Sequence, residues 1–534
     1  MSTTSYSIRA RPSERQKALR YYLIGIVLIL GAVITAGSVY VQRTPALSFR
    51  WVQSLLQRPI LAYQFAGLAE AAPDTGRNAR AIPSLTYHRI VADESDVNNV
   101  TTSRFKDQMS TLKAAGWETI SLEEFEKYIR GEIELPEKSF LLTFDDGTRE
   151  SFYPVDAVLK ALDYEAANFI IVESSEITKT VHYLNPREIE LMLSTGRWQI
   201  GSHSFDGHRE YRVDPSGATG IFFADWIWNT SAGRLETPEE FRERVTTDLT
   251  KAKSELERIF GKPIVSFAFP LGNETGVNGA NNYPEGAAVT EEVARGIYEF
   301  GFVQTNNQQF SANVPRTVSA SSSSVPLGDP FLMYRIHVDY DWDGARVLQE
   351  LENSLPKDLP YEDDFSRDRG WMPSWGNVEI GRNNFRLTAG ADNSGASAIL
   401  DGSQLWDDYR FDVGAQWNGG HMLVLGDVVD AATYHACTFA PGQVRIQELR
   451  NGQSTTLATK TDERIQYGEN VSAGIRVRGS VIECTWNFDS VVETYSRSFR
   501  GGVGIQAWAE EKGVATLQVT SVIARPLATS STLQ

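Results

Sequence analysis

The sequence is poor in cysteine, in histidine and in basic charge. Its 534 residues contain two cysteines and seven histidines, and 51 lysines and arginines stand against 68 acidic residues, giving a formal net charge of −17. Lys and Arg form no long stripe after residue 20, so the chain offers no surface suited to a polyanion, and we exclude binding to nucleic acid. Proportions of 41% hydrophobic and 22% charged residues also exclude wholesale disorder.

One long apolar run lies near the N-terminus. Residues 21–41, YYLIGIVLILGAVITAGSVYV, carry no formal charge, and at about 1.5 Å per residue they span a bilayer core of roughly 30 Å. The preceding residues 1–20 are basic, with Arg9, Arg11, Arg15, Lys17 and Arg20 against Glu14. The positive-inside tendency therefore predicts a cytoplasmic tail at 1–20 and a single-pass anchor at 21–41 in the cell membrane.

The same pattern predicts that everything after Val41 is extracytoplasmic, either periplasmic or extracellular. A cleaved signal peptide is the competing interpretation, but its apolar region is usually about 7–15 residues long and ends at a small-x-small site. Cys437 and Cys484 leave two interpretations open. In an exported protein they are able to form a disulfide, and otherwise they are two buried small apolar residues.

A chain of this length is too long for one hydrophobic core and predicts two or three domains. Residues 42–80 become rich in Ala, Gly, Pro and Asp, which is typical of a linker. Residues 81–355 alternate capped helices, beginning after Ser121, Asn185 and Thr237, with the apolar runs IPSLTYH, SFLLTF, ANFIIV, WQIGSH, VSFAFP and GFVQT. Strands of this kind, separated by helices, predict a parallel sheet, and so many repeats predict a barrel.

The pattern changes near residue 355. From residue 360 to 528 short alternating runs such as YRFDVGAQW and GQVRIQEL are separated by Gly, Asn and Asp turns, with no convincing helix. This predicts an all-β sandwich, and we treat it as a candidate carbohydrate-binding domain. It contains Trp371, Trp375, Trp406, Trp417 and Trp508, which are candidate sugar platforms, although most tryptophans of a sandwich belong to its core. We interpret His421 and His435 as structural.

Two strand ends carry polar side chains suited to chemistry. Asp145 and Asp146 follow the run SFLLTF and precede Gly147, and the second run, WQIGSHSFDGH, delivers His203 and His208. Ligands of parallel sheets bind at the carboxyl ends of strands. Two imidazoles and a carboxylate leave coordination positions open on a metal ion. The alternative is an N-cap carboxylate with a solvated neighbour, and surface histidines that cap a turn.

These residues resemble the polysaccharide deacetylases, carbohydrate esterase family 4, which share homology with the nodulation-factor deacetylases. The family motif TFDDG is present unaltered at residues 143–147, and H-S-F-D-G-H at 203–208 is one residue longer than the usual histidine motif. The longer spacing, the opening PSLTYHRI at 83–90 and FAFPLG at 267–272 are similar to the branch that deacetylates poly-β-1,6-N-acetylglucosamine. The resemblance covers about half of the chain.

The resemblance implies a distorted (β/α)7 barrel and a metal-dependent N-deacetylase, a hydrolase of a linear amide bond. Carried over residue by residue, it implies that Asp145 is the general base and that Asp146, His203 and His208 bind a divalent metal, usually zinc in the family. The bound metal would lower the pKa of a water molecule and polarise the acetamide. The backbone N–H of Leu271 is the candidate oxyanion donor.

The sequence departs from the family at two points. Ala268 occupies the position where many members have an arginine that orients the base, and the late motif that supplies a catalytic histidine is not recognisable. HVDYDW, residues 337–342, resembles a family motif only superficially, and we expect it to be a coincidence. The general acid is therefore open among His88, His182 and His337, and His88 is the candidate because it ends a strand.

The aromatic segment after the second histidine motif has two interpretations. Residues 211–234 include Phe222, Phe223, Trp226 and Trp228. They either form a lid over a substrate cleft, with Trp226 and Trp228 binding sugar, or an amphipathic plug that packs on the barrel.

The sequence thus predicts a membrane-anchored enzyme that deacetylates an N-acetylated polysaccharide of the exopolysaccharide or biofilm type. A deacetylase of peptidoglycan or chitin oligomers is the enzymatic alternative. A catalytically weak protein of the same fold that binds polysaccharide is the alternative from another class.

Overall fold

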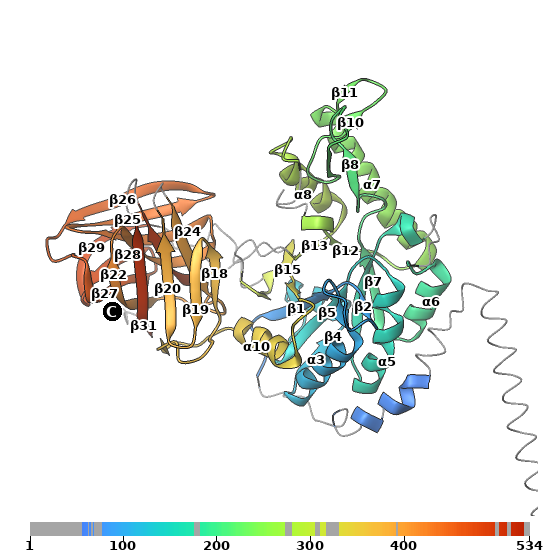
Figure 1. Cartoon of the computed structure of the whole chain (residues 1–534), viewed down its shortest axis with the longest axis horizontal. Helices are drawn as coiled ribbons and strands as arrows, with labels where there is room; N and C mark the ends of the chain where they lie inside the picture. Colours follow the sequence, from blue (N-terminus) through green and yellow to red (C-terminus); the bar gives the residue numbers. More distant parts are fainter. Residues whose placement is uncertain are drawn as a thin grey trace, which may run out of the picture.

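The structure is a computed structural model that describes residues 56–61, 63–65, 68, 77–175, 182–272, 280–304, 310–316, 331–390, 394–496, 501–509 and 514–527. Figure 1 shows a barrel-like α/β domain beside a β-sandwich, with α10 (Gly344–Ser354) on the side of the barrel that faces the sandwich. The predicted cytoplasmic tail and membrane anchor, residues 1–41, lie outside the described residues. None of the helices in the described ranges combines the length and the hydropathy needed to span a bilayer.

The first domain is built on a nearly closed parallel sheet. The strands lie in the order β1 (Ile82–Tyr87), β5 (Ser139–Phe144), β6 (Ala166–Ile170), β7 (Trp198–Ser202), β12 (Ser266–Ala268), β13 (Phe300–Val303) and β15 (Leu332–Tyr334). The residues of β1, β5 and β6 are buried throughout, as expected for strands covered on both faces. Each of the six apolar runs predicted to be strands forms one of these strands.

Two short segments close the sheet. β15 pairs in parallel with β13, and β16 (Ile336–His337), which follows after one residue, pairs in parallel with β1. The residue between them is Arg335, so the chain passes from one edge of the sheet to the other at this arginine. This strand was not predicted from the sequence. Its last residue, His337, is the first residue of HVDYDW, and the expectation that HVDYDW resembles the family motif only by coincidence stays a prediction. The short antiparallel strand β14 (Ala312–Asn313) also pairs with β1.

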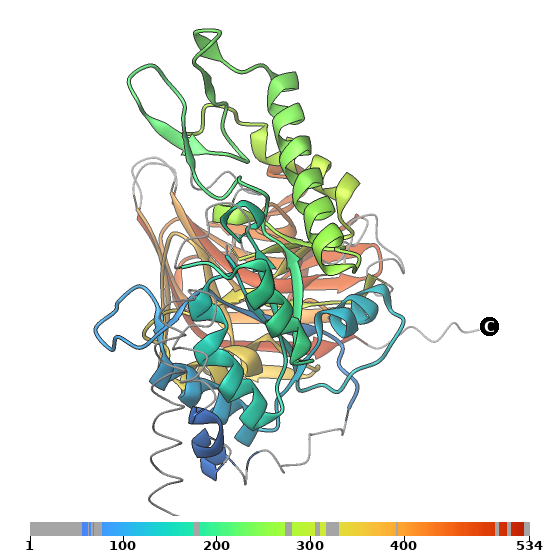
Figure 2. The same cartoon turned by 90° about the vertical axis from the view of Figure 1, so that its right-hand side faces the viewer.

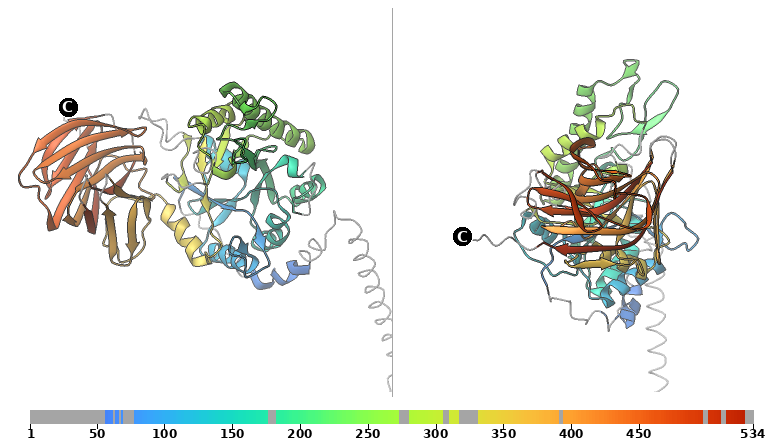
Figure 3. Two further views of the ribbon diagram at one scale, coloured as in Figure 1. Left: turned by 45° about the horizontal axis from the view of Figure 1, so that its top comes forward. Right: turned by 90° about the vertical axis from the view of Figure 1, so that its left-hand side faces the viewer.

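Helices surround the sheet (Figure 3). They are α3 (Thr102–Ala114), α4 (Leu122–Arg130), α5 (Tyr153–Leu162), α6 (Pro186–Ser194), α7 (Pro238–Phe260) and α8 (Gly286–Ile297). The predicted caps are confirmed: Ser121, Asn185 and Thr237 each form a capping box at the start of α4, α6 and α7. Figure 2 shows α7 rising beyond the barrel together with the small strands β8 (Glu210–Arg212), β9 (Thr219–Ile221), β10 (Trp228–Asn229) and β11 (Arg234–Leu235).

Glu126 makes the stability of this domain dependent on pH. It lies on α4, is 8% exposed, and accepts a hydrogen bond of 2.6 Å from Ser266 Oγ on β12. Burial raises the pKa of Glu126 to about 7, although Ser266 and Arg130 favour the ionised form. The folded-state pKa of Glu126 lies above its ordinary value, so the folded protein favours the protonated carboxyl group. The resulting contribution to the free energy of unfolding is fully present at about pH 4 and is lost as the pH rises through 7.

We expect Glu126→Gln to raise the free energy of unfolding at pH 8 by about 2 kcal/mol and to change it little at pH 4. Urea unfolding of the barrel at both pH values measures this difference. An equal effect of the substitution at pH 4 and pH 8 would show that Glu126 titrates normally in the folded protein.

The second domain is a sandwich of two antiparallel sheets. The first sheet contains, in order, β18 (Trp371–Trp375), β21 (Gly395–Leu400), β30 (Gly502–Trp508), β23 (His421–Asp430), β24 (Thr433–Ala440), β25 (Gln443–Arg450) and β26 (Gln453–Thr461). The second contains β19 (Asn377–Gly381), β20 (Asn384–Ala389), β31 (Ala515–Pro526), β22 (Tyr409–Asn418), β27 (Gly468–Arg478), β28 (Val481–Trp486) and β29 (Asp489–Tyr495), with β17 (Tyr361–Asp363) also paired to β31. Their facing side chains form one hydrophobic core.

The two cysteines form a disulfide within this core. Cys437 on β24 and Cys484 on β28 are bonded and fully buried, so the bridge joins the two sheets. This decides between the two interpretations that the sequence left open.

Candidate metal and catalytic site

The parallel strands end at one rim of the barrel. Tyr87 of β1 is in register with Phe144 of β5, and Ser202 of β7 is in register with Ile170 of β6 and Phe267 of β12. The residues that follow these strand ends therefore meet at the same rim, as they do in other barrels.

The turn after β5 separates the two adjacent carboxylates. Asp146 and Gly147 both have left-handed backbones, with φ of 75° and 71°. A Cβ at Gly147 would lie 2.9 Å from Ile170 Cδ1, so a side chain there would force Ile170 to move. Asp145 is 1% exposed, whereas the side chain of Asp146 is 17% exposed. The turn thus gives two neighbouring aspartates different surroundings, although left-handed backbone is uncommon outside glycine.

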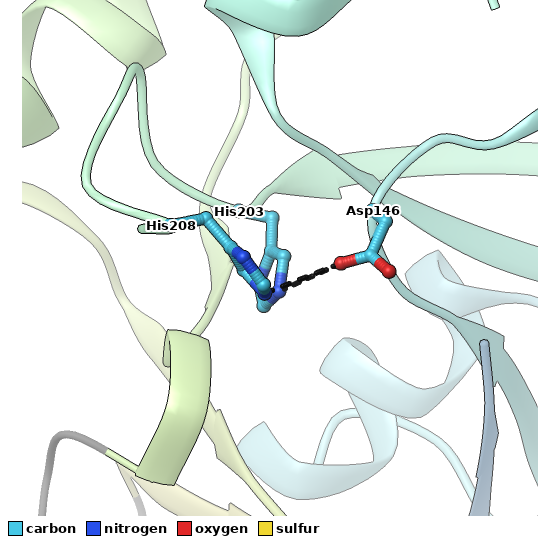
Figure 4. A group of neighbouring side chains, drawn as sticks. All are labelled: Asp146, His203 and His208. Atoms are coloured by element: carbon cyan, nitrogen blue, oxygen red, sulfur yellow. Dashed lines mark ion pairs between the residues drawn. The ribbon is translucent and has the colours of Figure 1, made fainter. Parts of the chain in front are cut away.

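Asp146, His203 and His208 converge on one point (Figure 4). His208 Nε2 lies 3.3 Å and His203 Nε2 lies 3.6 Å from Asp146 Oδ1. One donor atom from each residue lies within 4.8 Å of the others. Asp146 Oδ1 is buried and has no hydrogen-bond partner in the described part of the chain. A buried carboxylate oxygen facing two imidazole nitrogens is a donor set that suits a divalent cation, so these residues fit the predicted metal.

A backbone carbonyl orients His203. Its Nδ1 lies 2.8 Å from the carbonyl oxygen of Ala268, which is only an acceptor, so Nδ1 carries the proton and Nε2 offers its lone pair. Burial lowers the pKa of His203 to about 4, and the ring is therefore neutral near pH 7, as a metal ligand must be.

Asp248 on α7 anchors the loop that connects the two histidines. Its carboxylate accepts hydrogen bonds from the backbone N–H groups of Phe205 at 3.0 Å and Asp206 at 2.8 Å. At Gly207 a Cβ would lie 2.3 Å from a ring atom of Phe223, so this glycine lets the loop pack closely. Asp248 was not predicted to belong to the site, because a single aspartate within a long helix has no distinguishing pattern.

Arg335 holds Asp145. Its Nη1 and Nη2 atoms lie 2.6 and 2.8 Å from the two carboxylate oxygens, and the arginine is fully buried. The guanidinium lies near the rings of Phe169 and Phe302, at 5.2 and 6.0 Å from their centroids. This bidentate pair fixes the carboxylate in one orientation.

Arg335 corrects the sequence analysis, which inferred from Ala268 that an arginine partner of the base was missing. The partner comes from the junction of β15 and β16 instead. Burial by itself would raise the pKa of Asp145, but the positive charge of Arg335 and its hydrogen bonds to the carboxylate hold this pKa well below its ordinary range. Asp145 is therefore ionised throughout the physiological pH range.

Two further histidines lie beside this pair. His88 follows β1, and its ring centroid is 5.4 Å from that of His337 on β16. Asp145 is close enough to His337 to raise the pKa of that histidine, and His88 is close enough to Asp145 to lower the pKa of that carboxyl group. Burial and His88 lower the pKa of His337. His88 and His337 are thus both near the predicted base, and the role of His88 as a catalytic group stays a prediction. His182 is exposed, and its carbonyl accepts a hydrogen bond from Arg149 N.

The remaining predicted site residues, Leu271, Trp226 and Trp228, lie outside the donor set described above. Leu271 lies in the turn after β12 with a left-handed φ of 57°, and its role as oxyanion donor stays a prediction. Trp226 stacks on Tyr283 with ring centroids 4.5 Å apart, and Trp228 is half-buried in the β10–β11 hairpin.

Phe222 and Phe223 agree with the interpretation of the aromatic segment as a plug. They are buried against each other, with ring centroids 4.8 Å apart, as in a plug. Binding of sugar by Trp226 and Trp228 stays a prediction.

Comparisons with known proteins agree with these features. Residues 132–281 match the family model described as polysaccharide deacetylase. A poly-β-1,6-N-acetyl-D-glucosamine N-deacetylase of Escherichia coli (strain K12) is 21% identical over 298 residues, which cover 51% of this chain and 43% of the relative. The protein of the same name from Staphylococcus epidermidis is 28% identical over 141 residues, covering 23% of this chain and 48% of the relative.

The chain thus spans less than half the length of these two relatives. The solved structure of a de-N-acetylase from Aggregatibacter actinomycetemcomitans is 18% identical, covers 51% of this chain and 100% of its own, and superposes with a TM-score of 0.42.

Proposed function

We propose that this chain, whose residues 132–281 match the polysaccharide deacetylase family model, hydrolyses the acetamide groups of an N-acetylhexosamine polysaccharide and releases acetate. The observation that carries the proposal is the meeting of an arginine-held carboxylate, Asp145, with the donor set of Asp146, His203 and His208 at one rim. The relatives are named for poly-β-1,6-N-acetyl-D-glucosamine, which supports an exopolysaccharide as the substrate.

Asp146, His203 and His208 would hold a divalent cation, and zinc is the ion that the family resemblance implies. Such an ion, when bound, polarises the acetamide carbonyl and makes a water molecule more acidic. The ring of His203 is neutral near pH 7 and is oriented by its hydrogen bond to the carbonyl of Ala268, so it is ready to bind a cation.

Asp145 receives the proton of the attacking water. The Arg335 pair fixes the position of its carboxylate, but the same positive charge lowers its pKa and weakens it as a base. The residue would therefore depend on a water molecule that is already more acidic, which is consistent with its position next to Asp146, one of the three residues that would hold the cation.

His88 is the candidate to protonate the leaving nitrogen. The water oxygen bonds to the acetyl carbon, the C–N bond breaks, and the nitrogen takes up a proton to leave as the amine of the sugar. His88 follows the end of β1 at the rim where Asp145 lies, and His337 packs beside it. Protonation of a leaving group by a positioned side chain typically contributes about 10²–10⁴-fold to the rate.

The proposed setting is extracytoplasmic, with the chain attached to the cell membrane through residues 21–41. The apolar run and the basic residues before it support this orientation. The disulfide between Cys437 and Cys484 is also typical of exported proteins.

Release of acetate tests the proposal. The full-length chain in detergent is incubated with β-1,6-linked and β-1,4-linked N-acetylglucosamine oligomers, with and without a chelator. We expect acetate from the β-1,6-linked oligomers, its loss with chelator, and its recovery when a divalent metal is restored. Preference for the β-1,4-linked oligomers would favour a peptidoglycan or chitin substrate, and no metal-dependent acetate from any glycan would refute the enzymatic function.

A further inference from the structure

The structure divides the five candidate tryptophans of the sandwich into two groups, and the sixth tryptophan, Trp486, is 2% exposed in the core. Trp371, Trp406 and Trp417 are at most 5% exposed and belong to the core between the sheets. Trp375 and Trp508 are half-buried, and their rings lie in contact on the outer face of the first sheet, with centroids 6.1 Å apart. Only the second pair therefore has ring surface available for a ligand.

Trp375 and Trp508 line a cavity of about 480 Å³. Strands β30, β23, β24 and β25 supply its floor, because alternate side chains of each strand point away from the core. A Cβ at Gly395 of β21 would lie 2.5 and 2.6 Å from ring atoms of the two tryptophans, so the bare backbone there lets both rings lie close to the sheet. The size matches the cavities that bind small ligands and sugar units.

Polar groups with unused hydrogen-bonding capacity face this cavity. Gln506 is 5% exposed and accepts a hydrogen bond of 3.3 Å from Tyr434, while its amide nitrogen donates to no acceptor in the described ranges. Arg445, also in the lining, pairs through its backbone with the neighbouring strands, but its guanidinium has no hydrogen-bond or ion-pair partner in the described ranges. Aromatic faces next to unused planar donors match a sugar, whose C–H groups pack on rings while its oxygens accept hydrogen bonds.

The charge of the cavity distinguishes an acetylated sugar from a deacetylated one. None of the described residues that line it is an aspartate or a glutamate, and Arg445 is permanently charged. An N-acetylhexosamine is neutral and offers a carbonyl acceptor, whereas the free amine left by deacetylation is protonated near neutral pH. The cavity therefore favours the acetylated unit and repels the deacetylated one.

We propose that this cavity, the outer-face cavity, binds N-acetylated stretches of the polysaccharide that the barrel deacetylates, so that the sandwich holds substrate and releases product. The choice of ligand rests on the proposed function of the barrel.

The same sheet face connects the cavity to the barrel. Phe310 of the first domain packs on it near Gly502, since a Cβ at Gly502 would lie 2.6 Å from the Phe310 ring. Trp508 is six residues further along β30, which corresponds to about 20 Å of strand. A polymer held in the outer-face cavity is thereby kept close to the catalytic domain, which raises its effective concentration there.

Binding to a polymer that is not consumed tests the proposal. The full-length Asp145→Asn chain in detergent is titrated calorimetrically with poly-β-1,6-N-acetylglucosamine and with the same polymer after chemical deacetylation. We expect tighter binding of the acetylated polymer, a loss of about fivefold to tenfold in its affinity in Trp508→Ala, and a reversed preference in Arg445→Glu. Tyr495→Ala, which removes an 81% exposed ring from the other sheet, is the matched control and retains the parent affinity.

Acetate release from a short trisaccharide, measured without the Asp145 substitution, separates this proposal from the function of the barrel. We expect Trp508→Ala to leave this release unchanged. If no chain releases acetate but polymer binding still depends on Trp508, the barrel function is wrong and the outer-face cavity stands. If Trp508→Ala and Trp375→Ala bind the polymer as tightly as the parent, or the parent prefers the deacetylated polymer, the proposal for the cavity is wrong.

Discussion

Replacing Arg335 by methionine is expected to reduce acetate release by about 10²- to 10³-fold. The substitution keeps an unbranched apolar side chain but removes both hydrogen bonds to the Asp145 carboxylate. The base then loses its fixed orientation. Removal of one partner from a fully buried ion pair also leaves an uncompensated charge, so we expect the free energy of unfolding to fall by about 3–5 kcal/mol.

A double substitution separates the catalytic effect from the loss of stability. Asp145→Asn combined with Arg335→Met removes both buried charges, so most of the stability should return while activity does not. Arg316→Met is the matched control, because Arg316 is half-exposed and pairs with Glu299 at 3.0 Å. Loss of such an exposed pair should change stability by less than about 1 kcal/mol. Full activity in a folded Arg335→Met chain would remove Arg335 from the mechanism.

Asp146→Asn is expected to lower the bound metal to a small fraction of one ion per chain and acetate release by at least about 10³-fold. The change leaves only two imidazole ligands and removes the one negative charge of the donor set. Asparagine, like aspartate, tolerates the left-handed backbone found at this position, so the turn should keep its shape. Metal content after dialysis and acetate release from the same preparation measure both effects.

His337→Gln is the matched control for this substitution. His337 is a histidine at the same rim that lies beside His88 and outside the donor set, so its replacement should leave the metal content at the parent value. Retention of a full metal complement in Asp146→Asn would show that the cation binds elsewhere.

Local signals in the sequence were sufficient for much of the barrel and for the candidate metal ligands. The strands β1, β5, β6, β7, β12 and β13 were visible as apolar runs, and the caps of α4, α6 and α7 as residue patterns. Asp146, His203 and His208 were found because each follows a recognisable strand and because histidine is scarce in this chain.

The residues that were missed act over long distances in the sequence. Arg335 and Asp145 are 190 positions apart, and the strand that carries the arginine is broken into pieces of three and two residues. A signal did exist: six predicted strands leave a seven-stranded barrel one strand short, and FLMYRIHV is an apolar run with one arginine in its middle. Asp248 contacts its loop across more than 40 positions, without any such pattern.

The metal content of the Asp145→Asn chain tests the central claim most directly, because the two adjacent aspartates are assigned different tasks. If Asp145 takes the proton and Asp146 holds the cation, Asp145→Asn retains a full complement of metal while its acetate release falls by at least about 10³-fold. Loss of the metal together with the activity would contradict this division and make Asp145 a ligand.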